Sequence, residues 1–321
     1  MTTNLNEPNS GLPSLVVAVV NPPFDDRKAD VILRSCDGVD FRMFKSLLSF
    51  ASPFFEGMLA LPQPAASADS VNETKDGLPI IQIPEKSGAV EKLLMFCHPA
   101  CAPILQNLDE IQEVLAPAIK YDMVGVVKRV GEMLKPFAEK EPMRVFCITW
   151  QHRLEDEARV AAKHMLRLPI FPRPYVRELE SITAGTLHRL EGYHYRCGKA
   201  ARAIATSFGW ISLPSLIQFG SGCWNCSRGA TVTVLGGQLC ARNWWMDYMR
   251  DASDALVERP CGATVKGPEI MNKALKKASE CAQCRERVFV EMTEFSDLFA
   301  AEVEKATSCV SAIVRQTTYL Y

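Results

Sequence analysis

The first hydrophobic pattern along the chain is that of a β-hairpin. Residues 30–34 (DVILR) predict a strand, residues 36–38 (CDG) a tight turn in which glycine supplies a positive φ, and residues 39–42 (VDFR) the returning strand. Residues 78–83 (LPIIQI) predict a third strand. The start of the chain therefore predicts a short β-sheet.

Two short helices are expected directly after the hairpin. They cover residues 44–51 (FKSLLSFA) and 53–61 (PFFEGMLAL), with Ser52 as the N-cap and Pro53 at the first position of the second helix. Residues 62–79 are rich in Pro, Ala, Ser and Asp, which is typical of a mobile surface loop.

Helical periodicity dominates the rest of the chain. It resumes near Ala89, and a pair of helices is expected up to Leu134, with Asp109 and Gln112 as a possible capping box. Beyond Phe137 the spacing is almost wholly helical, with one strand-like segment at residues 230–235 (ATVTVL).

These patterns predict an α+β fold class: a short β-sheet flanked by helices at the N-terminal end, followed by a mostly helical C-terminal region. The expected organisation is a flexible arm over 1–23, an α+β domain over 24–136, a helical region over 137–215 and a Cys-rich, mostly helical region over 216–321.

Charge and hydropathy narrow the functional classes. With 36 basic and 37 acidic residues, the net charge of -1 provides no global positive field, so nucleic acid and acidic membranes are not expected partners. The longest apolar run near the start covers only residues 15–20 (LVVAVV), whereas a membrane span needs about 18 or more. We therefore expect no membrane span and no export signal, and a cytoplasmic or nuclear protein.

Cysteine spacing suggests one candidate metal site. Of 12 Cys, two Cys-x-x-Cys pairs, Cys223/Cys226 and Cys281/Cys284, have the spacing with which two thiolates bind one zinc ion. Together the four thiolates could form a structural tetrahedral site that links two segments far apart in the sequence. The alternatives are thiols packed in a reduced core, or a redox dithiol at Cys223-Trp224-Asn225-Cys226, although no helix is expected directly after that pair.

A set of residues in the first third of the chain matches a known family signature in order and spacing: Ala29-Asp30-Val31, Phe41-Arg42-Met43-Phe44-Lys45, Leu48, Ser49, Ser52-Pro53-Phe54-Phe55 and Met58. With these residues and its order of strands, turns and helices, the segment 24–136 resembles a BTB/POZ domain. The wider layout is similar to a group of uncharacterised fungal BTB proteins. The resemblance implies a protein-interaction module that often forms homodimers and in some members recruits a cullin-type ubiquitin ligase.

The resemblance also implies site residues. The family's charged pocket corresponds to Asp30 with Lys45, and Phe44 stands where the family usually has His. Cullin recruitment commonly uses an apolar-x-Glu element, which residues 71–73 (VNE) fit.

A candidate interface follows from the residues themselves. Phe54, Phe55, Met58 and Leu61 are closely spaced apolar residues on a short helix beside a loop. They could serve an interface, and ordinary core packing is the alternative for each of them.

We therefore expect a non-enzymatic, protein-binding chain that self-associates through the N-terminal domain and acts as a scaffold or adaptor. The alternatives are a substrate adaptor of a cullin ubiquitin ligase, a zinc-dependent transcriptional regulator and a thiol redox enzyme. The sequence contains no HExxH, GxSxG or phosphate-cradling glycine motif, which disfavours hydrolase chemistry.

Overall fold

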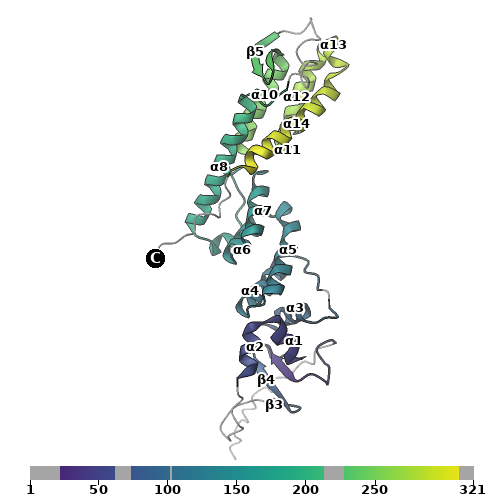
Figure 1. The fold of residues 1–321 in the computed structure, drawn as a ribbon, viewed down its shortest axis with the longest axis vertical. Helices are drawn as coiled ribbons and strands as arrows, with labels where there is room; N and C mark the ends of the chain where they lie inside the picture. The colour runs from purple at the N-terminus through teal and green to yellow at the C-terminus, as the bar shows by residue number, and fades with distance from the viewer. Residues whose placement is uncertain (1–21, 62–73, 102, 213–227, 311–321) are drawn as a thin grey trace, which may run out of the picture. The chain divides into compact units, whose positions relative to one another are not determined.

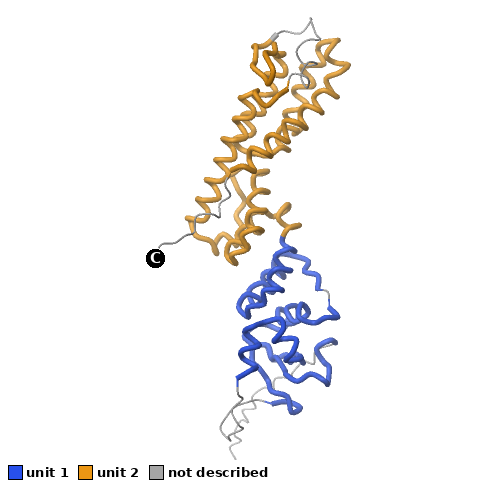
Figure 2. Tube along the Cα trace, in the orientation of Figure 1, with its two compact units in different colours: residues 1–134 blue, residues 135–321 orange. Residues whose placement is uncertain are grey.

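The computed structural model of the chain describes residues 22–61, 74–101, 103–212 and 228–310. The chain divides into two compact units, residues 1–134 and residues 135–321 (Figure 2). Residues 1–21 of the arm expected over 1–23 lie outside the described residues. None of the helices within the described ranges is both long and apolar enough to cross a membrane.

Unit 1 contains a four-stranded sheet with the strand order β2-β1-β4-β3. The strands are β1 (Val31–Arg34), β2 (Asp40–Met43), β3 (Thr74–Lys75) and β4 (Leu78–Gln82). β1 pairs antiparallel with β2 and parallel with β4, so the expected hairpin and third strand are confirmed. Gly38 in the hairpin turn has φ 82°, as expected. The two-residue edge strand β3 was not anticipated from the sequence.

The helices of unit 1 are α1 (Lys45–Ala51), α2 (Pro53–Ala60), α3 (Ser87–Cys97), α4 (Leu108–Lys120) and the first part of α5 (Val124–Lys140). Of these, α1, α2 and α3 lie nearer to the strands than α4 and α5 (Figure 1). As expected, Ser52 caps α2, since its Oγ accepts the Phe55 N–H at 3.0 Å, and Pro53 occupies the first helical position. The start of α2 therefore coincides with the local capping signal in the sequence.

The N-cap expected at Asp109 lies instead at Asn107. Asn107 Oδ1 accepts the backbone N–H of Glu110 at 2.9 Å, and Glu110 Oε2 accepts the N–H of Gln106 at 2.7 Å. The expected capping box was therefore wrong by two residues: an Asn with a Glu three positions later satisfies these donors.

The described residues of unit 2 are mostly helical and include one β-hairpin (Figure 1). Its elements are the rest of α5, then α6 (Pro142–Gln151), α7 (Glu155–Met165), the 3-10 helix η1 (Arg177–Ser181), α8 (Ala184–Thr206), β5 (Arg228–Val234), β6 (Gly237–Arg242), α10 (Asn243–Glu258), α11 (Gly262–Val265), α12 (Pro268–Ser279), α13 (Ala282–Arg285) and α14 (Val288–Ser308).

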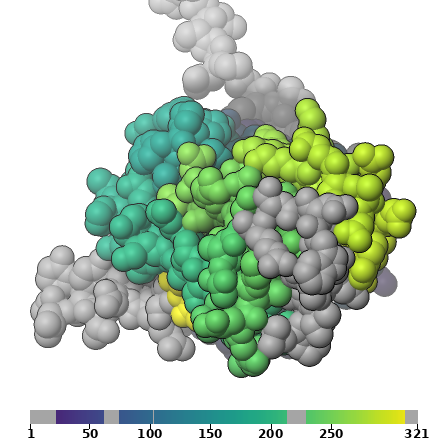
Figure 3. Space-filling view, turned by 90° about the horizontal axis from the view of Figure 1, so that it is seen from above, coloured from purple at the N-terminus to yellow at the C-terminus, as the bar shows by residue number. Residues whose placement is uncertain are grey.

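The core of unit 2 is aromatic. Trp245 and Tyr248 of α10 are buried against Phe295 of α14, and Trp210 stacks on Phe299 with ring centroids 5.5 Å apart. Figure 3 shows the green segments, which include β5, β6 and α10, lying between the teal helices and the yellow-green helices. α10 thus forms the centre around which α8, α12 and α14 pack.

Two glycines allow helices of unit 2 to approach closely. A Cβ on Gly262 would lie 2.8 Å from the carbonyl oxygen of Ala300 in α14, and one on Gly198 would lie 3.0 Å from that of Val257. The hairpin β5–β6 turns at Gly236, whose φ is 92°. Gly262 and Gly198 are required for their small size, and Gly236 for its positive φ.

Candidate functional site

The apolar residues expected to form an interface on α2 separate into exposed and buried groups. Phe54 is 47% exposed and Leu61, the residue after α2, is 65% exposed, whereas Phe55 is only 2% exposed and belongs to the core. Met58 is half-buried. Phe54 and Leu61 are therefore available to a partner, while Phe55 holds α2 in place.

Phe50 is a candidate interface residue that was not singled out from the sequence. It lies in the last turn of α1 and is 93% exposed, the most exposed large apolar side chain among the described residues. Leu48, two positions earlier, is fully buried. Because two helical positions are separated by about 200°, a core Leu48 directs Phe50 to solvent, and this signal could have been found in the sequence.

We use the term aromatic corner for Phe50 and Phe54, which lie on either side of the α1–α2 junction. Ser52 at this junction donates its hydroxyl proton to the carbonyl of Tyr121 while accepting the Phe55 N–H. The Tyr121 ring lies against Phe54, with centroids 5.4 Å apart. The α1–α2 junction is therefore fixed to the loop between α4 and α5, and the Phe54 ring is held in position before any partner arrives.

The Asp30 carboxylate contacts the backbone of Lys45 at the start of α1. Asp30 Oδ1 accepts the backbone N–H of Lys45 at 2.7 Å, while Phe44, the N-cap residue, provides no side-chain cap. The Asp30 side chain thus caps α1 from outside the helix. Asp30 is exposed and Lys45 is half-buried, so the negative charge remains accessible at the surface.

Asp37 in the hairpin turn has a similar role at α3. Its carboxylate accepts the backbone N–H of Ser87 at 2.9 Å and the Ser87 hydroxyl at 2.7 Å, and the N-cap residue Lys86 contributes no side-chain cap. Hydrogen bonds from the side chains of Ser35 and Ser87 lower the pKa of Asp37 to about 2. The hairpin therefore carries the carboxylates that cap two helices.

A third charged group lies on the sheet. Asp40 of β2 is paired with Arg34 of β1 at 2.6 Å and with Lys75 of β3 at 2.7 Å. Burial raises the pKa of the Asp40 carboxyl, but the hydrogen bonds from the two cations outweigh it, so the pKa lies below its usual value. This ion-pair group joins three strands and is a structural feature rather than a binding surface.

The cysteine pairs are described only in part. Cys223 and Cys226 lie outside the described residues, as do residues 71–73, which fit the cullin element. Cys281 is the N-cap of α13 and Cys284 lies within that helix, and both are half-buried. Within the described ranges, no group of three or more His, Cys, Asp or Glu side chains could hold a metal ion.

Several buried thiols are held in their neutral form. Burial raises the pKa of Cys97 and of Cys197 to about 11 and that of Cys147 to about 12. Because the thiolate is the nucleophile and metal ligand, these three cysteines are unsuited to either chemistry near neutral pH. Cys147 and Cys197 are core residues, whereas Cys97 at the end of α3 is half-buried.

Comparison with known proteins matches part of this chain to a family. The family model of the BTB/POZ domain matches residues 21–137. No curated protein matches the chain.

Proposed function

From the premise that residues 21–137 form a BTB/POZ domain, a protein–protein interaction module, we propose that the chain is a scaffold or adaptor that self-associates through this domain. The observation that carries the proposal is the aromatic corner. Phe50 and Phe54 expose large apolar surface on helices that are themselves fixed by Ser52 and Tyr121. Aromatic residues held rigidly at a surface are typical anchors of protein interfaces.

In a homodimer with two-fold symmetry, each corner residue contributes twice to the interface. Leu61 at the other end of α2 extends the apolar surface, and Asp30 with Lys45 supplies the charge that selects the partner. Light scattering of the full chain over a dilution series tests the proposal. We expect a concentration-dependent dimer, and a mass that stays monomeric up to high micromolar concentration would contradict it.

The second candidate function is that of a substrate adaptor for a cullin ubiquitin ligase. The sequence Val71-Asn72-Glu73 between α2 and β3 supports it, because it fits the apolar-x-Glu element of cullin-binding members of the family. The test is capture of a purified cullin N-terminal domain by the immobilised full chain. We expect Glu73→Ala to reduce capture and Glu258→Ala, an exposed residue of unit 2, to leave it unchanged; equal capture by all three forms would argue against the element.

The proposal includes a structural zinc ion held by Cys223, Cys226, Cys281 and Cys284. It is supported by the two Cys-x-x-Cys spacings and by the half-buried position of the second pair at α13. Metal analysis of the purified full chain tests it, with Cys281→Ser as the site variant and Cys309→Ser, an exposed cysteine, as the control. Stoichiometric zinc that Cys281→Ser abolishes is expected, and zinc absent from the unmodified chain would exclude the site.

A further inference from the structure

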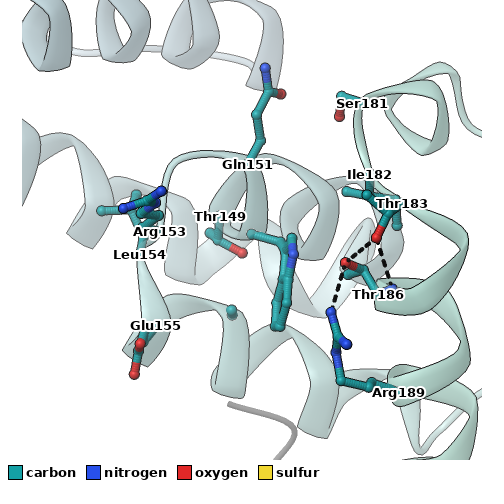
Figure 4. Close-up of a pocket in the computed structure, with 12 residues that line it drawn as sticks. Thr149, Gln151, Arg153, Leu154, Glu155, Ser181, Ile182, Thr183, Thr186 and Arg189 are labelled. Carbon is teal, nitrogen blue, oxygen red and sulfur yellow. Dashed lines mark hydrogen bonds between the residues drawn. The ribbon is translucent and has the colours of Figure 1, made fainter. Parts of the chain in front are cut away.

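A cavity of about 580 Å³ is formed by residues of unit 2. Its wall consists of the last residues of α6, the turn into α7, the end of η1 and the first turns of α8 (Figure 4). Residues that line it include Thr149, Trp150, Arg153, Thr183, Thr186 and Arg189. Its volume is within the usual range of ligand sites.

Arg189 of α8 presents a guanidinium in this cavity without a carboxylate partner among the described residues. The guanidinium lies over the Trp150 ring, 5.5 Å from the centroid. Its Nη2 is 3.5 Å from Thr186 Oγ1 (Figure 4). Its Nε is buried and has no hydrogen-bond partner. Stacking on Trp150 fixes the plane of a positive charge that nothing in the described part of the chain neutralises.

Arg153 adds a second positive charge to the lining of this cavity. It follows α6 in the left-handed backbone region, with φ 57°, and no carboxylate in the described ranges pairs with it. The acidic residue that lines the cavity, Glu155, is already paired with Arg159, its Oε2 lying 3.2 Å from Nη2. Most other arginines of the described part of unit 2, such as Arg144 and Arg173, have carboxylate partners.

The start of α8 contributes hydrogen-bond donors and a partial positive charge. Thr183 caps this 23-residue helix by accepting the Thr186 N–H at 3.2 Å, and the first turn contains no acidic residue. The cavity thus combines two unpaired guanidiniums, the hydroxyls of Ser181 and Thr183, and the positive end of a helix dipole. These positive groups and hydrogen-bond donors suit a compact ligand group that carries two negative charges better than they suit a carboxylate, which carries one.

We propose that this cavity binds a phosphate monoester, with Arg189 and Arg153 as its charge-bearing ligands. Arg189 contacts the phosphate with its planar fork, and Arg153 supplies the second charge from the opposite wall. The phosphate could be carried by a phosphorylated side chain of a partner protein or by a small metabolite. The site does not require the proposed self-association, so each can fail without the other.

Calorimetric titration of the full chain tests the site. The probes are inorganic phosphate, O-phosphoserine and a degenerate peptide library with a fixed central phosphoserine, beside the same library with Glu at that position. We expect every phosphate-bearing probe to bind, with affinity that falls as salt rises, and the Glu library to bind at least tenfold more weakly. Tighter binding of the phosphopeptides than of phosphoserine would identify a protein as the source, and equal binding a small molecule.

Substitutions of single arginines distinguish phosphate binding in this cavity from a nonspecific effect of positive charge. Arg189→Gln and Arg153→Gln should each weaken phosphate binding by about tenfold or more, because each removes a charge-assisted hydrogen bond. The control is Arg202→Gln, which removes the same charge from an exposed position farther along α8. Arg153 is exposed, so its variant should fold even if Arg189→Gln does not. Failure of the unmodified chain to bind any phosphate probe, or equal loss in Arg153→Gln and Arg202→Gln, would overturn the proposal.

Discussion

Replacement of Phe50 by Ser should disrupt self-association without destabilising the fold. Phe50 is 93% exposed, so it contributes little to the core. Complete burial of one Phe side chain at an interface is worth about 1.5–3 kcal/mol. A two-fold interface contains the residue twice, which gives about 3–6 kcal/mol per dimer and weakens the dissociation constant by roughly 10² to 10⁴.

Sedimentation equilibrium of the full chain measures this change. The matched control is Phe289→Ser, because Phe289 on α14 of unit 2 is also an exposed Phe, 69% exposed. We expect the control to dimerise as the unmodified chain does. At protein concentrations low enough for all three forms to be monomeric, the unfolding free energy of each variant should lie within about 0.5 kcal/mol of that of the unmodified chain. If Phe50→Ser and the unmodified chain had the same dissociation constant, the aromatic corner would not be the interface.

Three further predictions concern the fold. Phe55→Ala should destabilise the chain by about 3–5 kcal/mol in denaturant unfolding, because Phe55 is buried, whereas exposed Phe54→Ala should remain below about 1 kcal/mol. Gly262→Ala should destabilise it by about 1–3 kcal/mol, since the new Cβ would meet the Ala300 carbonyl oxygen; a neutral result would show that α11 can shift. The lowered pKa of Asp40 predicts a stabilisation that is complete above pH 3.8 and is lost as the pH falls through the lower pKa of the folded carboxyl. The stability difference between the unmodified chain and Asp40→Asn should therefore shrink in acid, and a difference independent of pH would contradict the ion-pair account.

Local chemistry explains why part of the fold could be predicted from sequence. The Ser52-Pro53 cap and the Asp37-Gly38 turn act within a few residues, so their sequence determines their geometry. Strand β6 was missed because its sequence, GQLCAR, contains no β-branched residue. Its Leu239 and Ala241 nevertheless alternate inward, and the turn at Gly236 was the signal that could have revealed it.

The candidate sites depended more on long-range packing. The pattern of 53–61 could not separate exposed Phe54 from buried Phe55, because both rings contact Tyr121 from a loop far along the chain and only the packed fold decides which of them is covered. The role of Asp30 as a cap likewise requires the fold to bring it to Lys45. In unit 2, Trp150 and Arg189 meet only through tertiary packing, so the cavity they line has no signature in the sequence.

The central claim is that the BTB/POZ domain drives self-association of the chain. Its most direct test is the mass of the unmodified full chain in solution, measured by light scattering across a dilution series into the high micromolar range. The account predicts a mass that rises from 35.7 kDa to about twice that value as concentration increases. A mass that remains at that of the single chain throughout would contradict it.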